Sequence, residues 1–559
     1  MKSIKRIFVS PQTSIFSAAG IIMIMVVASR ILGLVRQRVL ANFFPASDLS
    51  LFFAAFRLPD LIFEVLVFGT FASAFIPVFS KALKKDGKEV WEIASSVANL
   101  GLLIFLALAC LVIIFANQLY GFIAPGFGPE RRDIIVLLSR ILFVAQGFFV
   151  FSYVLTAILE SSRRFLVPAV APLFYNLGII LGTWLLSPRL GLLGPTIGVV
   201  IGAASHALIQ LPLAVKLGFR FSGKIRINDE VKKIGKLALP RIIEVSFMQL
   251  AKSVELFLAS LITTASYTYF TFGNSLQLLP VGLFGTSIAK AALPILSRQA
   301  DSRGQFKKTL FNALYQSVFL ALPVAVVLIV LRIPLVRLVY GTDIFSWEST
   351  VQTSLVLSAF GVGVVFQIAA SILARAFYAL HDTKTPVVIS ISAITLNIVL
   401  DFILIKVFKL PVWGLAAAFS FAYLLQVGVL FALISSRIFE RVSLKLLVPF
   451  VKSGVASVGA GAVMFFTLKF FDRSVWRGIR PASFEKFVLD THYTINLLIL
   501  TAFVILVGGL VYLVLSLLFK SNELKYFLNF VKKTFISRKL GIVSARQTEI
   551  VSLPPDGGN

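Results

Sequence analysis

Long apolar stretches alternate with short charged or Pro/Gly-containing breaks along almost the whole chain. Because a helix needs roughly 20 apolar residues to cross a bilayer, the pattern predicts about 14 membrane spans. Their approximate limits are 13–38, 49–80, 90–118, 133–160, 165–187, 193–216, 235–262, 266–297, 306–332, 350–378, 385–407, 411–436, 445–471 and 494–519. The sequence therefore predicts an all-α polytopic membrane protein. Composition agrees, since 58% of the 559 residues are hydrophobic and only 14% are charged.

Basic residues gather in alternate loops, which predicts the orientation of the chain. They are concentrated between residues 81 and 88, 216 and 236, 298 and 308, and after Lys520. Cytoplasmic loops carry an excess of Lys and Arg, so these segments and both termini are expected inside. The same bias accounts for the net charge of +28, and no nucleic-acid partner is expected.

Two short repeats relate the first half of the chain to the second. Residues 74–81 (AFIPVFSK) recur six spans later as residues 291–298 (AALPILSR), and Asn176 and Asn397 are also six spans apart. Six is an even number, so two such lobes would share one membrane orientation. We predict two six-helix lobes related by a pseudo-two-fold, with a central cavity between them. The predicted limits are 1–220 and 221–440 for the lobes, 441–520 for helices 13 and 14, and 521–559 for a basic cytoplasmic tail.

The first two spans contain several charged residues. An ionisable side chain at membrane depth is costly and usually faces a cavity or a partner. Arg30 and Arg36 lie in the first span, whereas Arg57, Asp60 and Glu64 share one face of the second. Guanidinium groups bind phosphate through paired hydrogen bonds, so one interpretation is an anion-binding wall. The other is that Arg36 snorkels to the interface and Arg57 pairs with Asp60. The residues alone leave both open.

A second polar group lies in the C-terminal half. Lys252 and Glu255 are one turn apart in the seventh span, and Asn397 and Asp401 are four apart in the eleventh. Glu255, Asn397 and Asp401 offer oxygen ligands for a small cation if the two helices touch. The alternative, favoured by the residues alone, is that Lys252 neutralises Glu255 and that Asp401 lies near the helix end.

Enzyme signatures are missing from the sequence. There is no G-x-x-x-x-G-K-[ST] phosphate loop and no H-E-x-x-H metal helix. We therefore predict no enzymatic activity, no catalytic residues and no cofactor other than a coupling cation.

Three segments resemble the MurJ/MviN lipid II flippase family, and the resemblance extends over nearly the whole chain. They are residues 30–36 (RILGLVR), residues 56–60 (FRLPD) and residues 375–386 (RAFYALHDTKTP). The resemblance implies a transporter of the multidrug/oligosaccharidyl-lipid/polysaccharide exporter superfamily. It would move a lipid-linked peptidoglycan precursor from the inner to the outer leaflet of the bacterial cytoplasmic membrane. A cationic cavity lined by the first, second, seventh and eighth helices would receive the head group.

The resemblance also implies roles for individual residues. Arg30 and Arg36 match two cavity arginines, and Glu255, Asn397 and Asp401 match positions similar to the family's sodium ligands. The chain departs from the family where Phe63 and Glu64 replace paired arginines and Ser275 replaces another. The expected substrate-binding residues are Arg30, Arg36, Arg57, Glu64, Lys252 and Ser275. Either Arg57, Lys252 or Lys290 compensates for the lost charge, or the substrate differs.

The leading hypothesis is a lipid II flippase that works by alternating access. The missing arginines keep two alternatives open: a flippase or exporter for another polyprenyl-linked glycan or amphiphile, and a non-transporting cell-wall scaffold. The expected partners are lipid II or a related polyprenyl-pyrophosphate glycolipid, membrane lipids, and, for a scaffold, other cell-wall synthesis proteins.

Overall fold

The computed structural model describes residues 15–68, 74–83, 89–438, 444–472, 489–491 and 493–529. Within these ranges the regular structure is helical, apart from one isolated bridge between Asp472 and Leu489. The predicted all-α fold is therefore confirmed. Most of the predicted tail, from residue 530 onward, lies outside the described residues.

Twelve helices of the described ranges are long and apolar enough to cross a membrane. They correspond to the third to fourteenth predicted spans. Their bounds are Val90–Ile114, Pro125–Ser161, Leu166–Leu190, Leu193–Lys216, Ile242–Ile262, Ser266–Arg298, Arg303–Val330, Trp347–Ala379, Lys384–Val407, Trp413–Ile438, Val448–Phe471 and Thr494–Leu518. The polytopic architecture is confirmed, whereas the count of 14 is not.

The first two predicted spans have a different character from the rest. The first is helix α2 (Ile15–Phe43), and it contains three arginines. The second is broken into α3 (Ala46–Ala55), α4 (Arg57–Phe63), the π-helical turn η1 (Glu64–Phe68) and α5 (Ile76–Ala82). Pro59 contributes to the break because it has no N–H to donate to Ala55. The Ala55 carbonyl instead accepts a bond of 2.9 Å from the Tyr120 hydroxyl.

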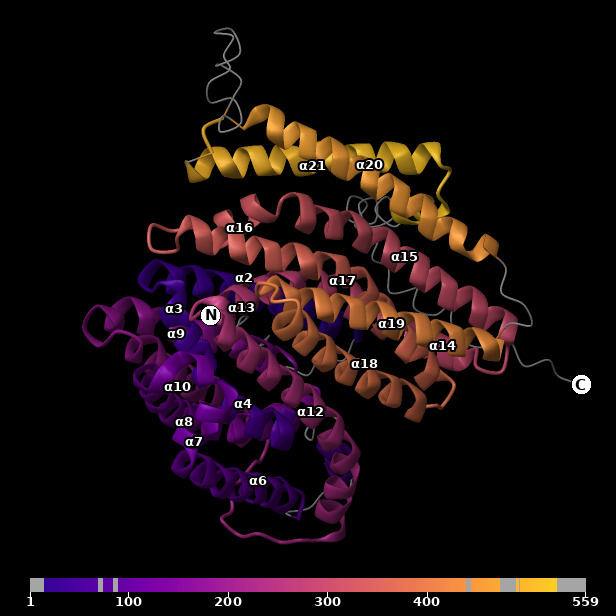
Figure 1. The fold of residues 1–559 in the computed structure, drawn as a ribbon. Coiled ribbons are helices and arrows are strands. Elements are labelled where there is room, and N and C mark those ends of the chain that lie inside the picture. Colours follow the sequence, from indigo (N-terminus) through magenta and orange to yellow (C-terminus); the bar gives the residue numbers. More distant parts are fainter. Residues whose placement is uncertain are drawn as a thin grey trace, which may run out of the picture.

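In the part of the chain that the structure describes, the N-terminal half continues with six helices and one 3-10 turn. They are α6 (Glu89–Ile114), α7 (Ala116–Ile123), the short 3-10 turn η4 (Pro125–Phe127), α8 (Gly128–Ser161), α9 (Leu166–Leu190), α10 (Leu193–Leu208) and α11 (Leu211–Lys216). Helix α8 packs against α3, α6 and α10, and α9 lies between α10 and α2 (Figure 1).

Helices α9 and α10 approach each other closely because glycines face glycines. A Cβ atom on Gly198 would lie 2.5 Å from the carbonyl oxygen of Gly178, and one on Gly182 would lie 2.5 Å from the Cα of Gly198. Small residues spaced four apart allow such backbone contact between membrane helices. The pair forms a closely packed support behind α2.

The C-terminal half begins with α12 (Asp229–Ile262) and is centred on α17. Its other elements are α13 (Ser266–Pro280), the π-helical turn η5 (Val281–Thr286), α14 (Ser287–Arg298), α15 (Arg303–Val330), α16 (Arg332–Tyr340), α17 (Trp347–Ala379), α18 (Lys384–Phe402), the π-helical turn η6 (Ile403–Val407) and α19 (Trp413–Ile438). Helix α17 packs against α13, α15 and α19. A π-helical turn thus interrupts the second helix of each half.

The last two long helices form a pair on the outside of this half. After the 3-10 turn η7 (Leu444–Leu447), α20 (Val448–Phe471) and α21 (Thr494–Leu518) pack on each other and on α15 and α16 (Figure 1). The assignment of the chain to two lobes at residues 220, 440 and 520 stays a prediction.

Candidate functional site

A cavity of about 640 Å³ lies between α2, α8, α9 and α13. We call it the α2 cavity. Its polar lining residues are Ser29, Arg30, Arg36, Gln37, Thr156, Glu160, Tyr175, Asn176 and Ser275. Helices α2 and α9 form two of its walls, because Asn176 donates to the Pro172 carbonyl at 3.1 Å and reaches the Ser29 carbonyl at 3.5 Å.

The two arginines of the α2 cavity are not neutralised by the protein. Arg30 is exposed, and the salt bridges among the described residues do not include Arg30 or Arg36. The Arg36 guanidinium lies 6.0 Å from the centre of the Tyr175 ring, and its buried Nε has no hydrogen-bond partner. Both side chains are therefore available to an anionic ligand.

Two residues that line the α2 cavity take part in hydrogen bonds to the C-terminal half. Gln37 donates to Ser275 of α13 at 2.8 Å, and the Tyr340 hydroxyl of α16 donates to the Gln37 oxygen at 2.9 Å. Ser275 thus lines the cavity, and it also links α2 to α13 through Gln37.

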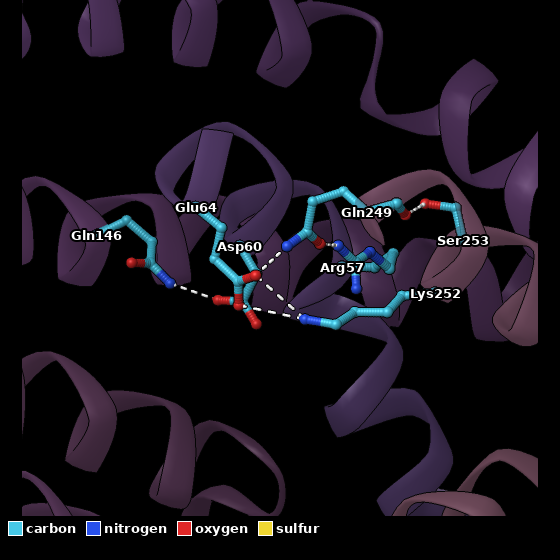
Figure 2. Close-up of polar contacts among 7 residues, drawn as sticks. All are labelled: Arg57, Asp60, Glu64, Gln146, Gln249, Lys252 and Ser253. Carbon is cyan, nitrogen blue, oxygen red and sulfur yellow. Dashed lines mark hydrogen bonds and ion pairs between the residues drawn. The ribbon is translucent and has the colours of Figure 1, made fainter. Parts of the chain in front are cut away.

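The remaining predicted substrate-binding residues lie in a second group, shown in Figure 2. We call it the bridging cluster; its members are Arg57, Asp60, Glu64, Gln146, Gln249 and Lys252. Arg57, which is only 5% exposed, donates to Gln249, and Gln249 donates to Glu64. The Lys252 Nζ lies 3.1 Å from a Glu64 oxygen. These bonds join α4 and η1 to α12.

The bridging cluster differs from the pairings that the sequence left open. Arg57 bonds to Gln249 rather than forming an ion pair with Asp60, whose carboxylate accepts a bond of 2.6 Å from Gln146 on α8. Lys252 pairs with Glu64 rather than with Glu255, its neighbour on the same helix. In both cases a partner on another helix replaces a partner one turn away.

The structure thus divides the six predicted substrate-binding residues into two sets. Arg30, Arg36 and Ser275 line the α2 cavity, whereas the other three belong to the bridging cluster. Aromatic contacts connect the two places, since Phe149 has its ring 5.1 Å from Tyr175 and 5.9 Å from Phe63. A role in binding substrate stays a prediction for all six.

The three predicted cation ligands lie on two helices in contact. Helix α12 packs against α18, and Glu255 is near enough to Asp401 to interact with it electrostatically. Asn397 and Asp401 are buried, and the Asn397 amide donates to Asp401 at 2.9 Å. The amide oxygen of Asn397 and the other carboxylate oxygen of Asp401 are buried without a hydrogen-bond partner. Two orphaned oxygens and a nearby carboxylate suit a small hard cation.

The cation site would depend on the amide oxygen as well as on carboxylates. Among the described residues no group of three or more His, Cys, Asp or Glu side chains could hold a metal ion. The site therefore has two carboxylates, from Glu255 and Asp401, and needs Asn397 as a third ligand. This weak set fits a monovalent ion better than a tightly held divalent one.

Sequence reasoning missed residues that the structure places at the site. Gln146 and Gln249 complete the bridging cluster, and Tyr175 and Glu160 line the α2 cavity. Glu160 could have been noticed as the only acidic residue between 134 and 228. Uncharged glutamines give no comparable signal.

Similarity to known proteins places this arrangement in a class. A solved MATE family transporter of the MOP superfamily, in an inward-facing conformation, has the same fold with a TM-score of 0.63; it is 14% identical, covering 73% of this chain and 94% of that one. The chain thus has the fold of this class of multi-pass membrane protein. A family model described as "Lipid II flippase MurJ" matches residues 14–478. The chain belongs to this MurJ family, as the resemblance implied.

Individual relatives agree with the family assignment. The probable lipid II flippase MurJ of Vibrio cholerae is 32% identical over 428 residues, which are 74% of this chain and 81% of the relative. The lipid II flippase MurJ of Thermosipho africanus is 29% identical over 509 residues, 90% of this chain and 97% of the relative. A solved structure titled "Lipid II flippase MurJ, inward closed conformation" has a TM-score of 0.74 and 29% identity, covering 89% of this chain and 98% of that one.

Proposed function

We propose that this protein is a flippase for lipid II, the lipid-linked peptidoglycan precursor. The observation that carries the proposal is the α2 cavity, in which Arg30 and Arg36 have no counter-ion among the residues that the structure describes. Two unpaired guanidinium groups in a partly desolvated cavity attract a pyrophosphate. The family is one of transporters, and the protein acts by binding and moving a lipid rather than by catalysis.

Movement of the head group follows from alternating access. Gln37 and Ser275, which line the α2 cavity, form a hydrogen bond between the two halves of the chain. Rocking of the halves would break this contact and open the site toward the other leaflet, while the polyprenyl tail stays in the lipid. The membrane is the bacterial cytoplasmic membrane, with both termini inside, as the basic loops favour.

Sodium is the proposed coupling ion. A ligand biases a conformational equilibrium only when it binds the two states with different affinity. Glu255 and the Asn397–Asp401 pair lie on different helices, α12 and α18, so their separation can change with conformation. Binding at Glu255, Asn397 and Asp401 would favour the state in which the helices are close.

The experiment replaces the endogenous flippase of a bacterium with this chain. We expect growth to be restored and lipid II to reach the outer leaflet, and we expect Arg36→Ala to abolish both. Arg131→Ala, in the exposed first turn of α8, is the matched control and should grow normally. Full growth of a normally expressed Arg36→Ala variant would contradict the proposal, as would failure of the well-inserted parent chain.

Failure of the parent chain would shift the assignment to one of two other functions. A different polyprenyl-linked glycan is favoured by Glu64 and Ser275, which replace family arginines. A non-transporting scaffold for cell-wall proteins is opposed by the intact α2 cavity.

A further inference from the structure

We propose that Glu160 is a specificity residue that binds an ammonium group on the translocated head group. The inference rests on the proposed flippase function and deepens it. It assigns the substrate class as a lipid-linked glycopeptide that carries a free primary amine in addition to its phosphates.

The first observation is that Glu160 lines the α2 cavity together with Arg30 and Arg36. It is the only acidic residue among the cavity-lining residues. A carboxylate in a site built only for a pyrophosphate would repel the ligand and weaken binding. A site with both signs of charge suits a ligand with both signs.

The second observation is that the protein leaves the Glu160 carboxylate without a partner. The salt bridges of the described residues do not include it, and no side-chain hydrogen bond to it is formed there. Thr156, one turn earlier on α8, donates its hydroxyl to Gln210 instead. A half-buried carboxylate with no partner is unfavourable on its own, and a cationic ligand would offset that cost.

The third observation is that the two signs of charge come from different helices. Glu160 lies near the end of α8, whereas Arg36 belongs to α2 and lies over Tyr175 of α9. A ligand that contacts both must carry its phosphate and its ammonium on separate groups, as a sugar-peptide head group does. Phosphatidylethanolamine is the other source of an ammonium, and the lipid composition of the nanodisc separates the two.

The test measures binding to the full-length protein in phosphatidylglycerol nanodiscs. Two probes are used: lipid II whose only free amine is a lysine side chain, and the same molecule with that amine acetylated. We expect the parent protein to bind the free amine about tenfold more tightly, the effect of one charge-assisted hydrogen bond. We expect Glu160→Gln to bind both probes with the affinity that the parent shows for the acetylated one.

The matched control is Glu130→Gln, an exposed carboxylate near the start of the same helix, which should keep the tenfold preference. The ratio between probes is the informative readout, because a misfolded variant would lose both affinities together. A second variant, Glu160→Asp, keeps the charge and should keep a reduced preference for the free amine.

Three results would overturn the proposal. Equal binding of both probes by the parent, or an unchanged preference in Glu160→Gln, would refute the role of Glu160 and leave the flippase function standing. Loss of the preference when phosphatidylethanolamine replaces half of the nanodisc lipid would show that a bulk lipid supplies the ammonium. Absence of binding by either probe would overturn the flippase function together with this inference.

Discussion

The α2 cavity and the bridging cluster contain the same kinds of side chains. The charged side chains are bonded to other protein groups in the bridging cluster, whereas they lack ion-pair partners in the α2 cavity. In the bridging cluster Arg57 is buried and bonded to Gln249, and Lys252 is paired with Glu64. In the α2 cavity Arg30, Arg36 and Glu160 form no ion pair among the described residues. An intramembrane arginine is therefore a stronger candidate for a binding site when the protein leaves its charge unpaired.

The α2 cavity and the bridging cluster are therefore expected to have different roles. Charges satisfied by side chains from another helix hold helices together, as Arg57 and Glu64 hold α4 and η1 to α12. Charges left unpaired are available to a ligand. Variants in the bridging cluster should therefore change stability, and variants in the α2 cavity should change binding.

The largest effect is expected for Arg57→Ala. Removal of the guanidinium leaves the oxygen of Gln249 unsatisfied and breaks the chain of bonds to Glu64. We expect the free energy of unfolding to fall by about 3 kcal/mol, as for the loss of one partner of a buried polar pair. Denaturant titration in detergent micelles measures it. An unchanged midpoint would show that the bridging cluster does not hold the helices.

The second-largest effect is expected for Arg36→Ala, which should weaken binding but leave the free energy of unfolding nearly unchanged. Its Nε is buried without a partner, so removal of the side chain costs the folded state little. Binding of lipid II should weaken by about 2 kcal/mol, or roughly 30-fold, through loss of a charge-assisted contact. Binding and unfolding are measured on the same preparation. A loss of stability as large as that of Arg57→Ala would remove the distinction between the two places.

The sequence predicted what depends on helix periodicity and missed what depends on which helices meet. Twelve spans, and the common face of Asn397 and Asp401, follow from patterns within one segment. The division of the arginines between two places does not, because Arg57 meets Gln249 across 192 positions of the chain. The spacing of residues along one helix can identify only partners about one turn apart.

The cation site resembles the α2 cavity rather than the bridging cluster, since Asn397 and Asp401 each keep one buried oxygen without a partner. Sodium should therefore stabilise the parent protein, by about 1.4 kcal/mol at ten times its dissociation constant. Asp401→Asn should abolish this gain, and potassium in place of sodium serves as the control for ionic strength. If sodium leaves the melting temperature of the parent protein unchanged, the proposal that this site binds a coupling ion is contradicted.

The smallest effect concerns a polar pair at the surface, which shows what burial adds to the bridging cluster. Between α17 and α18, Asp382 accepts bonds from the Thr385 hydroxyl at 2.6 Å and the Thr385 backbone N–H at 2.9 Å, and Arg437 lies 2.7 Å away. These contacts, led by the Thr385 hydroxyl, lower the pKa of Asp382 to about 2 from its usual 3.8.

A carboxylate whose pKa is lowered by folding stabilises the protein above its unfolded pKa and loses that contribution as the pH falls through the folded value. The contribution of Asp382 should be complete at pH 5 and should decline between about pH 4 and pH 2. Because the Arg437 side chain is 44% exposed, solvent screening keeps the effect below about 1 kcal/mol. Asp382→Asn keeps an oxygen for the Thr385 backbone N–H but not the charge, so its melting temperature should lie below that of the parent at pH 5 and approach it only as the pH falls to about 2. A difference as large at pH 2 as at pH 5 would mean that the pair is held by something other than charge.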